Sequence, residues 1–271
     1  MDGTSPRLWP YSANNSPLPI PSQPVLYTPR AVIDLHFDGD AAVADVDMGK
    51  DAVLAYAEHY RTNESTLASL LKSEGAPPLS ERRPILLQGE LANPYRLQEM
   101  GMDALPLLPV RLEGICRTWA DSLDPRDAYP GVHHVTLART PGWWEMSVLG
   151  LASKEQLKHI RDWLDNGVPH AWKPVKLAEG CVRFEHETVM PPDQNEVEWD
   201  GTHERVSRPM PGPTGPNLLL DDLLVVVHTR HGCYNHRGRI ARCVHMQQRA
   251  FHEQLFRKGS SHRWNDVLTV N

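Results

Sequence analysis

Three carboxylates in this sequence have surroundings that suit proton transfer. Glu145 follows Trp143 and Trp144, and a carboxyl packed against indole rings loses hydration, which raises its pKa toward the range useful for general acid–base catalysis. Asp162 and Asp165 stand near the end of a predicted helix, where either is a candidate general base. The alternative for all three is an ordinary solvated acid on the surface.

Other residues are of the types that bind metal ions. The C-terminal part of the chain carries zinc-type ligands at His228, His231, Cys233, His236, Cys243 and His245. Their order matches no zinc motif, and a spacing of two residues on a helix separates side chains by roughly 200°. Paired acids that divalent cations would accept occur at Asp38, Asp40, Asp45 and Asp47, but hairpin turns also favour Asp and Gly. We therefore predict no metal site.

The charge of the chain is unevenly distributed. The 271 residues have a formal net charge of −6, yet residues 228–263 contain eight Lys and Arg against the single acid Glu253. This segment is thus +7 and the remainder is −13. A basic segment of this kind can bind nucleic acid or an acidic partner, but it lacks an RNA-binding aromatic signature, since Tyr234 is the only aromatic residue in its loop. Pairing with the acidic remainder of the same chain is the alternative, and nucleic acid is the less favoured partner.

Hydropathy and cysteine usage predict a cytoplasmic protein. Mean hydropathy is −0.46, and no apolar run approaches the roughly 20 residues that a membrane-spanning helix needs. No basic region followed by an apolar core opens the chain, so we expect no signal peptide and no membrane partner. The four cysteines are widely spaced, which predicts free thiols in a reducing compartment.

Proline divides the chain into segments. Seven prolines fall in residues 1–30, a density that excludes a helix or a central strand because each Pro lacks an amide donor. These residues are predicted to form an extended arm, which is a candidate docking segment for a protein partner. A second segment rich in Pro, Gly and acids, residues 188–217, is predicted to be a linker.

Periodicity predicts an α+β body between these segments. Asn93 with Pro94, and Ser153 with Gln156, are helix-start signals. The predicted strands lie at 31–37, 42–46, 84–87, 110–119, 132–138, 144–151, 172–177 and 218–228, and the predicted helices at 51–60, 65–71, 94–100, 154–164 and 240–255.

The middle of the chain resembles the γ-glutamylcyclotransferase (AIG2-like) family. The resemblance rests on residues 85–97, Ile-Leu-Leu-Gln-Gly-Glu-Leu-Ala-Asn-Pro-Tyr-Arg-Leu, which look like the family's strand, glycine loop and Asn-Pro helix. Residues 135–142 and 146–150 look like its central strand, Pro-Gly turn and next strand, and residues 157–160 look like the helix that follows. About 100 of the 271 residues are covered.

The resemblance implies an enzyme that releases 5-oxoproline from a γ-glutamyl amine or peptide, without a cofactor. Gln88, Gly89, Glu90 and Leu91 would form the loop whose backbone amides receive the substrate carboxylate. A Glu near the end of the later helix would take a proton from the substrate α-amine and return it to the leaving amine. The alternative for the loop is a strand-to-helix turn that simply needs glycine.

The sequence departs from the family pattern at both functional places. The loop carries Gln88 and Glu90 where the family has Tyr and Ser, and a loop Glu would repel a substrate carboxylate. Leu164 falls where the catalytic Glu is expected, which leaves Asp162, Asp165 and Glu145 as the candidate bases. The rival hypothesis is therefore a non-catalytic structural or interaction protein that docks through its proline-rich arm and basic C-terminal segment.

The predicted organisation has five parts. They are an extended arm (1–30), a strand–helix extension (31–80), a γ-glutamylcyclotransferase-like small mixed β-barrel with flanking helices (81–187), the linker (188–217) and a basic C-terminal strand–loop–helix extension (218–271).

Overall fold

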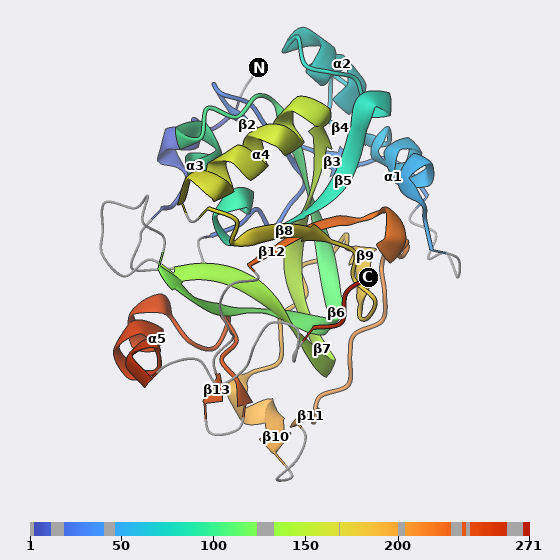
Figure 1. Ribbon diagram of the computed structural model, residues 1–271. Coiled ribbons are helices and arrows are strands. Elements are labelled where there is room, and N and C mark those ends of the chain that lie inside the picture. The colour runs from blue at the N-terminus through green and yellow to red at the C-terminus, as the bar shows by residue number, and fades with distance from the viewer. Residues whose placement is uncertain are drawn as a thin grey trace.

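A computed structural model describes residues 3–11, 19–40, 47–123, 133–167, 169–199, 204–228, 235–236, 239–258 and 268–271. These ranges form a mixed α+β structure around one large sheet (Figure 1). Several sequence predictions fall outside them: the strand at 42–46, Asp45, His231, Cys233 and three arginines of the basic segment, Arg230, Arg237 and Arg263.

The described elements are as follows. The large sheet contains β1 (Val25–Tyr27), β2 (Val32–Asp34), β5 (Arg82–Leu87), β6 (Leu105–Leu123), β7 (His133–Ser153), β8 (Trp172–Val175), β9 (Cys181–Phe184) and β12 (Leu224–His228). Three small pairs are β3 (His36–Phe37) with β4 (Tyr60–Arg61), β10 (Val197–Trp199) with β11 (Glu204–Val206), and β13 (Asn235–His236) with β14 (Arg239–Ile240). The helices are α1 (Lys50–Ala57), α2 (Leu67–Ser73), α3 (Pro94–Glu99), α4 (Lys154–Gly167) and α5 (Gln248–Gln254), and the short 3₁₀ turns include η1 (Pro6–Leu8), η4 (Gly89–Ala92) and η5 (Gln194–Glu196).

The strand order of the large sheet is β2-β1-β6-β7-β5-β12-β8, with β9 also paired to β6. The β5–β12 pair is parallel and the other pairs are antiparallel. Within the described residues β2 and β8 end this path, so the small barrel that the resemblance implies is not found as a closed barrel. The confirmed part of the fold prediction is the α+β class with flanking helices.

The hairpin of β6 and β7 is the longest feature of the sheet and is sharply bent. Its register shifts between Glu113 and Ile115, and Gly114 between them has a φ of +73°, a conformation that glycine adopts without a steric penalty. Strand β7 has four residues, 140–143, opposite the single residue Gly114 of β6, an excess of three. The two strands predicted at 132–138 and 144–151 are therefore one bent strand. The hairpin connects the end of the molecule that carries α3 and α4 with the end near α5 and β10 (Figure 1).

Alternation along the strands places helices on both faces of the sheet. In β5, Leu86 joins an apolar cluster with Val53 of α1 and Leu67 of α2. Its neighbours Ile85 and Leu87 join a second cluster that includes Ile160 of α4. Successive strand residues point to opposite faces, so both faces are covered and the core has two layers.

The helix-start signals are confirmed. Asn93 Oδ1 accepts a hydrogen bond of 3.2 Å from the amide of Arg96, with Pro94 in the first turn of α3. Ser153 and Gln156 form a capping box at α4: the Ser153 Oγ accepts from the Gln156 amide at 3.2 Å, and Gln156 Oε1 accepts from the Ser153 amide at 3.0 Å.

The helix predicted at 240–255 is wrong over its first half. Only Gln248–Gln254 is helical. The backbone of the preceding residues bonds to β6 instead: the Cys243 amide donates to the Arg117 carbonyl at 3.0 Å, and the Thr118 hydroxyl donates to the Ala241 carbonyl at 2.9 Å. Long-range pairing with β6 thus replaces the local helical bonds that the apolar spacing predicts.

The proline-rich arm is folded against the body where it is described. Asn93 Nδ2 donates to the carbonyls of Pro10 at 3.1 Å and Pro19 at 2.9 Å, and Trp9 Nε1 donates to the Pro19 carbonyl at 3.0 Å. The arm continues into β1, which pairs with both β2 and β6. The expectation that residues 1–30 contain no inner strand is therefore wrong at 25–27.

No helix in the described ranges is long and apolar enough to cross a membrane.

Asn93 has two roles, and substitutions separate them. We expect Asn93→Asp to keep the helix cap but to release the arm, because a carboxylate cannot donate to the two proline carbonyls. Asn93→Ala loses both roles and should cost about 1 kcal/mol more through the missing cap. Limited proteolysis of the N-terminal segment reports the arm, and thermal unfolding reports the cap.

Thr66→Ala is the matched control for that experiment. Thr66 caps α2 through a hydrogen bond of 3.2 Å that its hydroxyl accepts from the Ser69 amide. It should lower stability by a similar amount and leave the proteolysis of the N-terminal segment unchanged. An Asn93→Asp arm as resistant to proteolysis as the native arm would contradict the assignment.

Candidate functional site

The glycine loop that the resemblance points to is a buried turn between three strands. Gly89 has a φ of +54°, and a Cβ there would lie 3.2 Å from side-chain atoms of Val135 in β7. Gln88 is 6% exposed, and its Nε2 donates to the Val226 carbonyl of β12 at 3.1 Å. Leu91 is buried in the apolar cluster beneath α4. The positive φ and the close approach of Val135 each favour glycine at this position, and the substrate role of the loop stays a prediction.

Glu90, the charged residue of this loop, is held by α3. Its Oε2 accepts from Nη2 of Arg96 at 2.8 Å and from Nε at 3.2 Å. Arg96 also donates to Glu99 at 2.8 Å, so one guanidinium binds both carboxylates. The Glu90 carboxylate is engaged within the protein.

Helix α4 turns its two candidate aspartates away from the loop. Ile160 and Leu164 pack into the cluster that contains Leu91, with Leu164 only 1% exposed. Asp162 is exposed, and its nearest cation is Arg161 at 3.8 Å. Asp162 and Asp165 line an open hollow on the outer side of α4, together with His159, Trp163 and Asn166. The apolar residue Leu164, rather than a carboxylate, faces the loop.

Glu145 is fully buried at the other end of the bent hairpin. Its Oε1 accepts from the backbone amide and the Nε of Arg117, both at 2.9 Å. Its Oε2 accepts from the indole of Trp143 at 3.1 Å. The predicted contact with tryptophan is thus present, and three donors, one of them the ion-paired guanidinium of Arg117, occupy both carboxylate oxygens.

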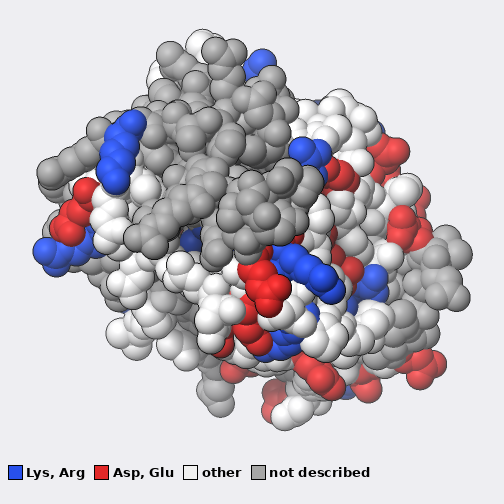
Figure 2. Space-filling model, turned by 90° about the horizontal axis from the view of Figure 1, so that it is seen from below, with Lys and Arg blue, Asp and Glu red and all other residues white. Residues whose placement is uncertain are grey.

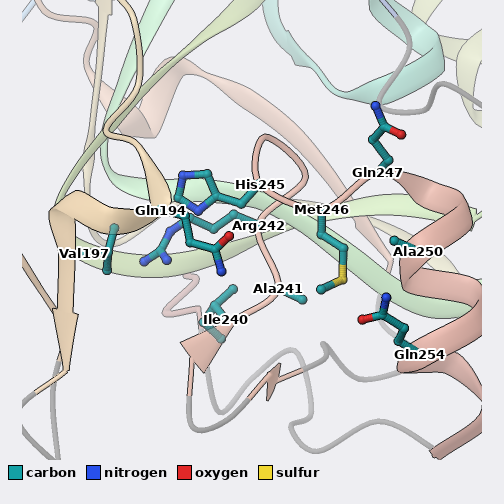
Figure 3. A pocket seen from close by; sticks show the side chains of 10 residues that line it. All are labelled: Gln194, Val197, Ile240, Ala241, Arg242, His245, Met246, Gln247, Ala250 and Gln254. Carbon is teal, nitrogen blue, oxygen red and sulfur yellow. The ribbon is translucent and has the colours of Figure 1, made fainter.

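A cavity of about 410 Å³ lies beyond Trp143. Figure 3 shows Arg242, His245 and Gln194 on one side and Ala250 and Gln254 of α5 on the other. The described residues that line it are Gln194, Val197, Ile240, Ala241, Arg242, His245, Met246, Gln247, Ala250 and Gln254.

Trp143 positions the two strongest hydrogen-bonding groups of this cavity. The guanidinium carbon of Arg242 lies 4.3 Å from the centre of the indole, a cation–π contact. The His245 ring meets the same indole edge-on at 5.2 Å. Arg242 is 3% exposed and forms an ion pair with Glu204 of β11. A planar cation held by an aromatic face and a carboxylate has little freedom to move.

His245 has a defined protonation pattern. Its Nε2 lies 2.8 Å from the Pro192 carbonyl, and since a carbonyl only accepts, Nε2 carries the proton and Nδ1 carries a lone pair. Burial holds the pKa of His245 below its usual range, and the positive charge of Arg242 adds to this effect. The imidazole is therefore neutral near pH 7.

The proposed metal ligands are dispersed. His228 in β12 stacks on His134 at 5.3 Å beside Trp172, whereas Cys243 packs near Trp119 and Phe251. Asp38 pairs with Arg61 at 2.9 Å. The described ranges contain no group of three His, Cys, Asp or Glu side chains placed to hold a metal ion.

The basic segment does not expose all of its charge. Arg242 is buried, and Arg249 pairs with Glu253 at 3.1 Å. On the described part of the face in Figure 2, acidic and basic side chains lie side by side. No single-sign surface for nucleic acid is present on that described part.

No known protein family, curated protein or solved structure matches this chain.

Sequence reasoning placed Glu145 beside tryptophan but missed the cavity. Arg242 and His245 were visible only as members of a charged segment, 99 and 102 residues from Trp143. The only signal for the cavity in the sequence is an arginine and a histidine three residues apart. That local spacing does not indicate that both side chains pack against Trp143 of β7.

The buried network of Glu145 should be essential for stability. Glu145→Gln removes the charge opposite Arg117 and places an amide NH₂ beside one of the three donors. Breaking a buried ion pair typically costs about 3–5 kcal/mol, and we expect a loss of that order in urea unfolding followed by tryptophan fluorescence. Asp162→Asn, on the exposed side of α4, is the control and should change stability by less than about 0.5 kcal/mol. Equal stability of the two variants would contradict this interpretation.

Proposed function

We propose that this chain is a binding protein with γ-glutamylcyclotransferase-like architecture that does not carry out the cyclotransferase reaction. One observation carries the proposal: Leu164 occupies the place of the expected catalytic carboxylate and is buried among the apolar residues under the glycine loop.

The chemistry explains why this residue decides the matter. Release of 5-oxoproline needs a group that takes a proton from the α-amine and returns it to the leaving amine. A leucine side chain has no titratable atom. Leu164 belongs to the same buried apolar cluster as Leu87 and Leu91, and such surroundings offer a water molecule no polar partner.

The remaining carboxylates support the same proposal. Glu90 is engaged by Arg96, Glu145 is enclosed by Arg117 and Trp143, and Asp162 faces solvent on the outer side of α4. A general base must be within hydrogen-bond reach of the proton it removes. None of these described groups is placed to reach a substrate at the glycine loop.

The proposed γ-glutamylcyclotransferase-like architecture is more specific than the α+β class and rests on the order of the elements. The order β5, η4, α3, β6, β7, α4, β8 is the order of strand, glycine turn, Asn-Pro helix, strands, helix and strand that the resemblance implies. In this chain β1 and β2 add to β6, and β12 inserts between β5 and β8. With these added strands the sheet of this chain is wider than the small barrel that the resemblance implies.

The binding role does not use the described part of the arm. The Pro10 and Pro19 carbonyls accept from Asn93 at the start of α3, and the Tyr11 ring stacks on Tyr95 at 4.8 Å; the Trp9 indole donates to Pro19 within the arm. A partner that docked on those residues would have to displace these contacts. The preformed cavity beside Trp143 is the better candidate for binding.

The test is an assay for 5-oxoproline with the full-length protein and γ-glutamyl amines and peptides as substrates. We expect no release above the buffer control, because Leu164 stands where the resemblance implies the proton carrier. An active γ-glutamylcyclotransferase serves as the positive control for each substrate. Release that persists after purification and disappears in Glu145→Gln, Asp162→Asn or Asp165→Asn would overturn the proposal.

A further inference from the structure

We propose that the cavity between β10, β14 and α5 binds a small neutral amide, whose carbonyl accepts from Arg242 and whose N–H donates to His245. This inference rests on the binding role proposed above and names the chemical class of the ligand.

Arg242 supplies the donor. Its Nη2 is bound to Glu204, whereas no hydrogen bond to Nη1 is present within the described structure, and the buried Nε also has no acceptor. The residue is 3% exposed and lines the cavity. A buried guanidinium with donors left over is costly unless an acceptor completes it. A ligand carbonyl would supply that acceptor.

His245 supplies the acceptor. Because its Nε2 donates to Pro192, the lone pair is on Nδ1, and no hydrogen bond to Nδ1 is present in the described part of the chain. Arg242 and His245 both lie against Trp143, at 4.3 and 5.2 Å from the ring centre. One donor and one acceptor side by side are complementary to the acceptor and donor of an amide.

Charge selects a neutral ligand. The positive charge of Arg242 is balanced by Glu204, and that of Arg117 behind Trp143 is balanced by Glu145. A ligand carboxylate would therefore find no unpaired cation in the cavity. It would also have no N–H to donate to His245. The other polar groups seen in Figure 3 include the amides of Gln194 and Gln254, which are themselves uncharged.

The remaining lining and the size fix the rest of the ligand. Val197, Ile240 and Ala250 provide apolar surface. The volume of about 410 Å³ lies in the usual range for small-molecule sites, roughly 300–1,000 Å³. The ligand class is thus an amide on a small aliphatic body.

Three matched probes test this directly by calorimetric or NMR titration of the full-length protein. They are 4-methylpentanamide, its methyl ester counterpart methyl 4-methylpentanoate, and the 4-methylpentanoate anion. We expect saturable binding of the amide, and binding about tenfold weaker for the ester because it lacks the N–H, which corresponds to about 1.4 kcal/mol. The anion should bind more weakly than the amide by at least the same factor.

A variant tests whether His245 causes the preference for the amide over the ester. His245→Phe keeps a ring against Trp143 but removes the acceptor, so amide and ester should then bind equally. His159→Phe is the control, since His159 also bonds a backbone carbonyl, that of Met100 at 2.7 Å, but lies outside this cavity. It should retain the preference for the amide.

The outcomes separate the two proposals. Equal binding of the three probes to the native protein, no binding of the amide, or a preference that survives in His245→Phe would each overturn the amide site. The probe ranking needs no variant, so a poorly folded variant does not rescue the proposal. None of the probes is a γ-glutamyl compound; release of 5-oxoproline would instead overturn the proposed function and leave this ranking unaffected.

Discussion

The pairing of buried arginines is the constraint on which this structure depends. Among the residues that the structure describes, five arginines are almost completely inaccessible to water: Arg82, Arg96, Arg111, Arg117 and Arg242. Removing the partner of one buried charge costs about 3–5 kcal/mol, a large share of the net stability of about 5–15 kcal/mol that a domain has. Four of the five are therefore paired with carboxylates. Arg82 is the exception: its Nη1 donates to the Leu151 carbonyl at 2.8 Å and to Gln156 at 3.1 Å, and burial lowers its pKa to about 10.

This constraint also determines which acids remain available for chemistry. Glu90 and Glu145 are the candidate carboxylates nearest to buried elements, and each is the counter-ion of a buried arginine. Asp162, which has no such duty, is exposed on the solvent side of α4, and Asp165 is half-buried with its Oδ1 inaccessible to water. A protein that kept a catalytic carboxylate would have to leave one buried acid free, and at the expected place this chain has Leu164. Glu90 and Glu145 neutralise buried arginines, and for that reason they are not available as a general base.

The parts of the fold that were predictable from sequence are those fixed by neighbours along the chain. The caps at Asn93 and Ser153 need only residues three positions away, so α3 and α4 begin where their signals predict. The segment 240–247 has helical apolar spacing, yet Thr118 and Arg117 of β6 bind its backbone. That competition involves residues more than 120 positions apart and leaves no local trace. For the same reason Glu145 was identified through adjacent tryptophans, whereas the cavity formed by Arg242 and His245 was not.

The Arg242–Glu204 ion pair joins the basic segment, residues 228–263, to the acidic remainder of the chain. Sequence alone left open whether the basic segment serves an external partner or the acidic remainder of the chain. For Arg242 the partner is the chain itself: the side chain is buried, contacts the ring of Trp143 and forms an ion pair with Glu204 of the acidic linker. The pair brings three distant segments together, β7, β11 and the residues before α5, and the cavity lies beside them, between β10, β14 and α5. Satisfying Arg242 with a single carboxylate leaves Nη1 pointing to no acceptor of the described chain, so the interaction that closes this end of the fold is also what gives the cavity its hydrogen-bonding character.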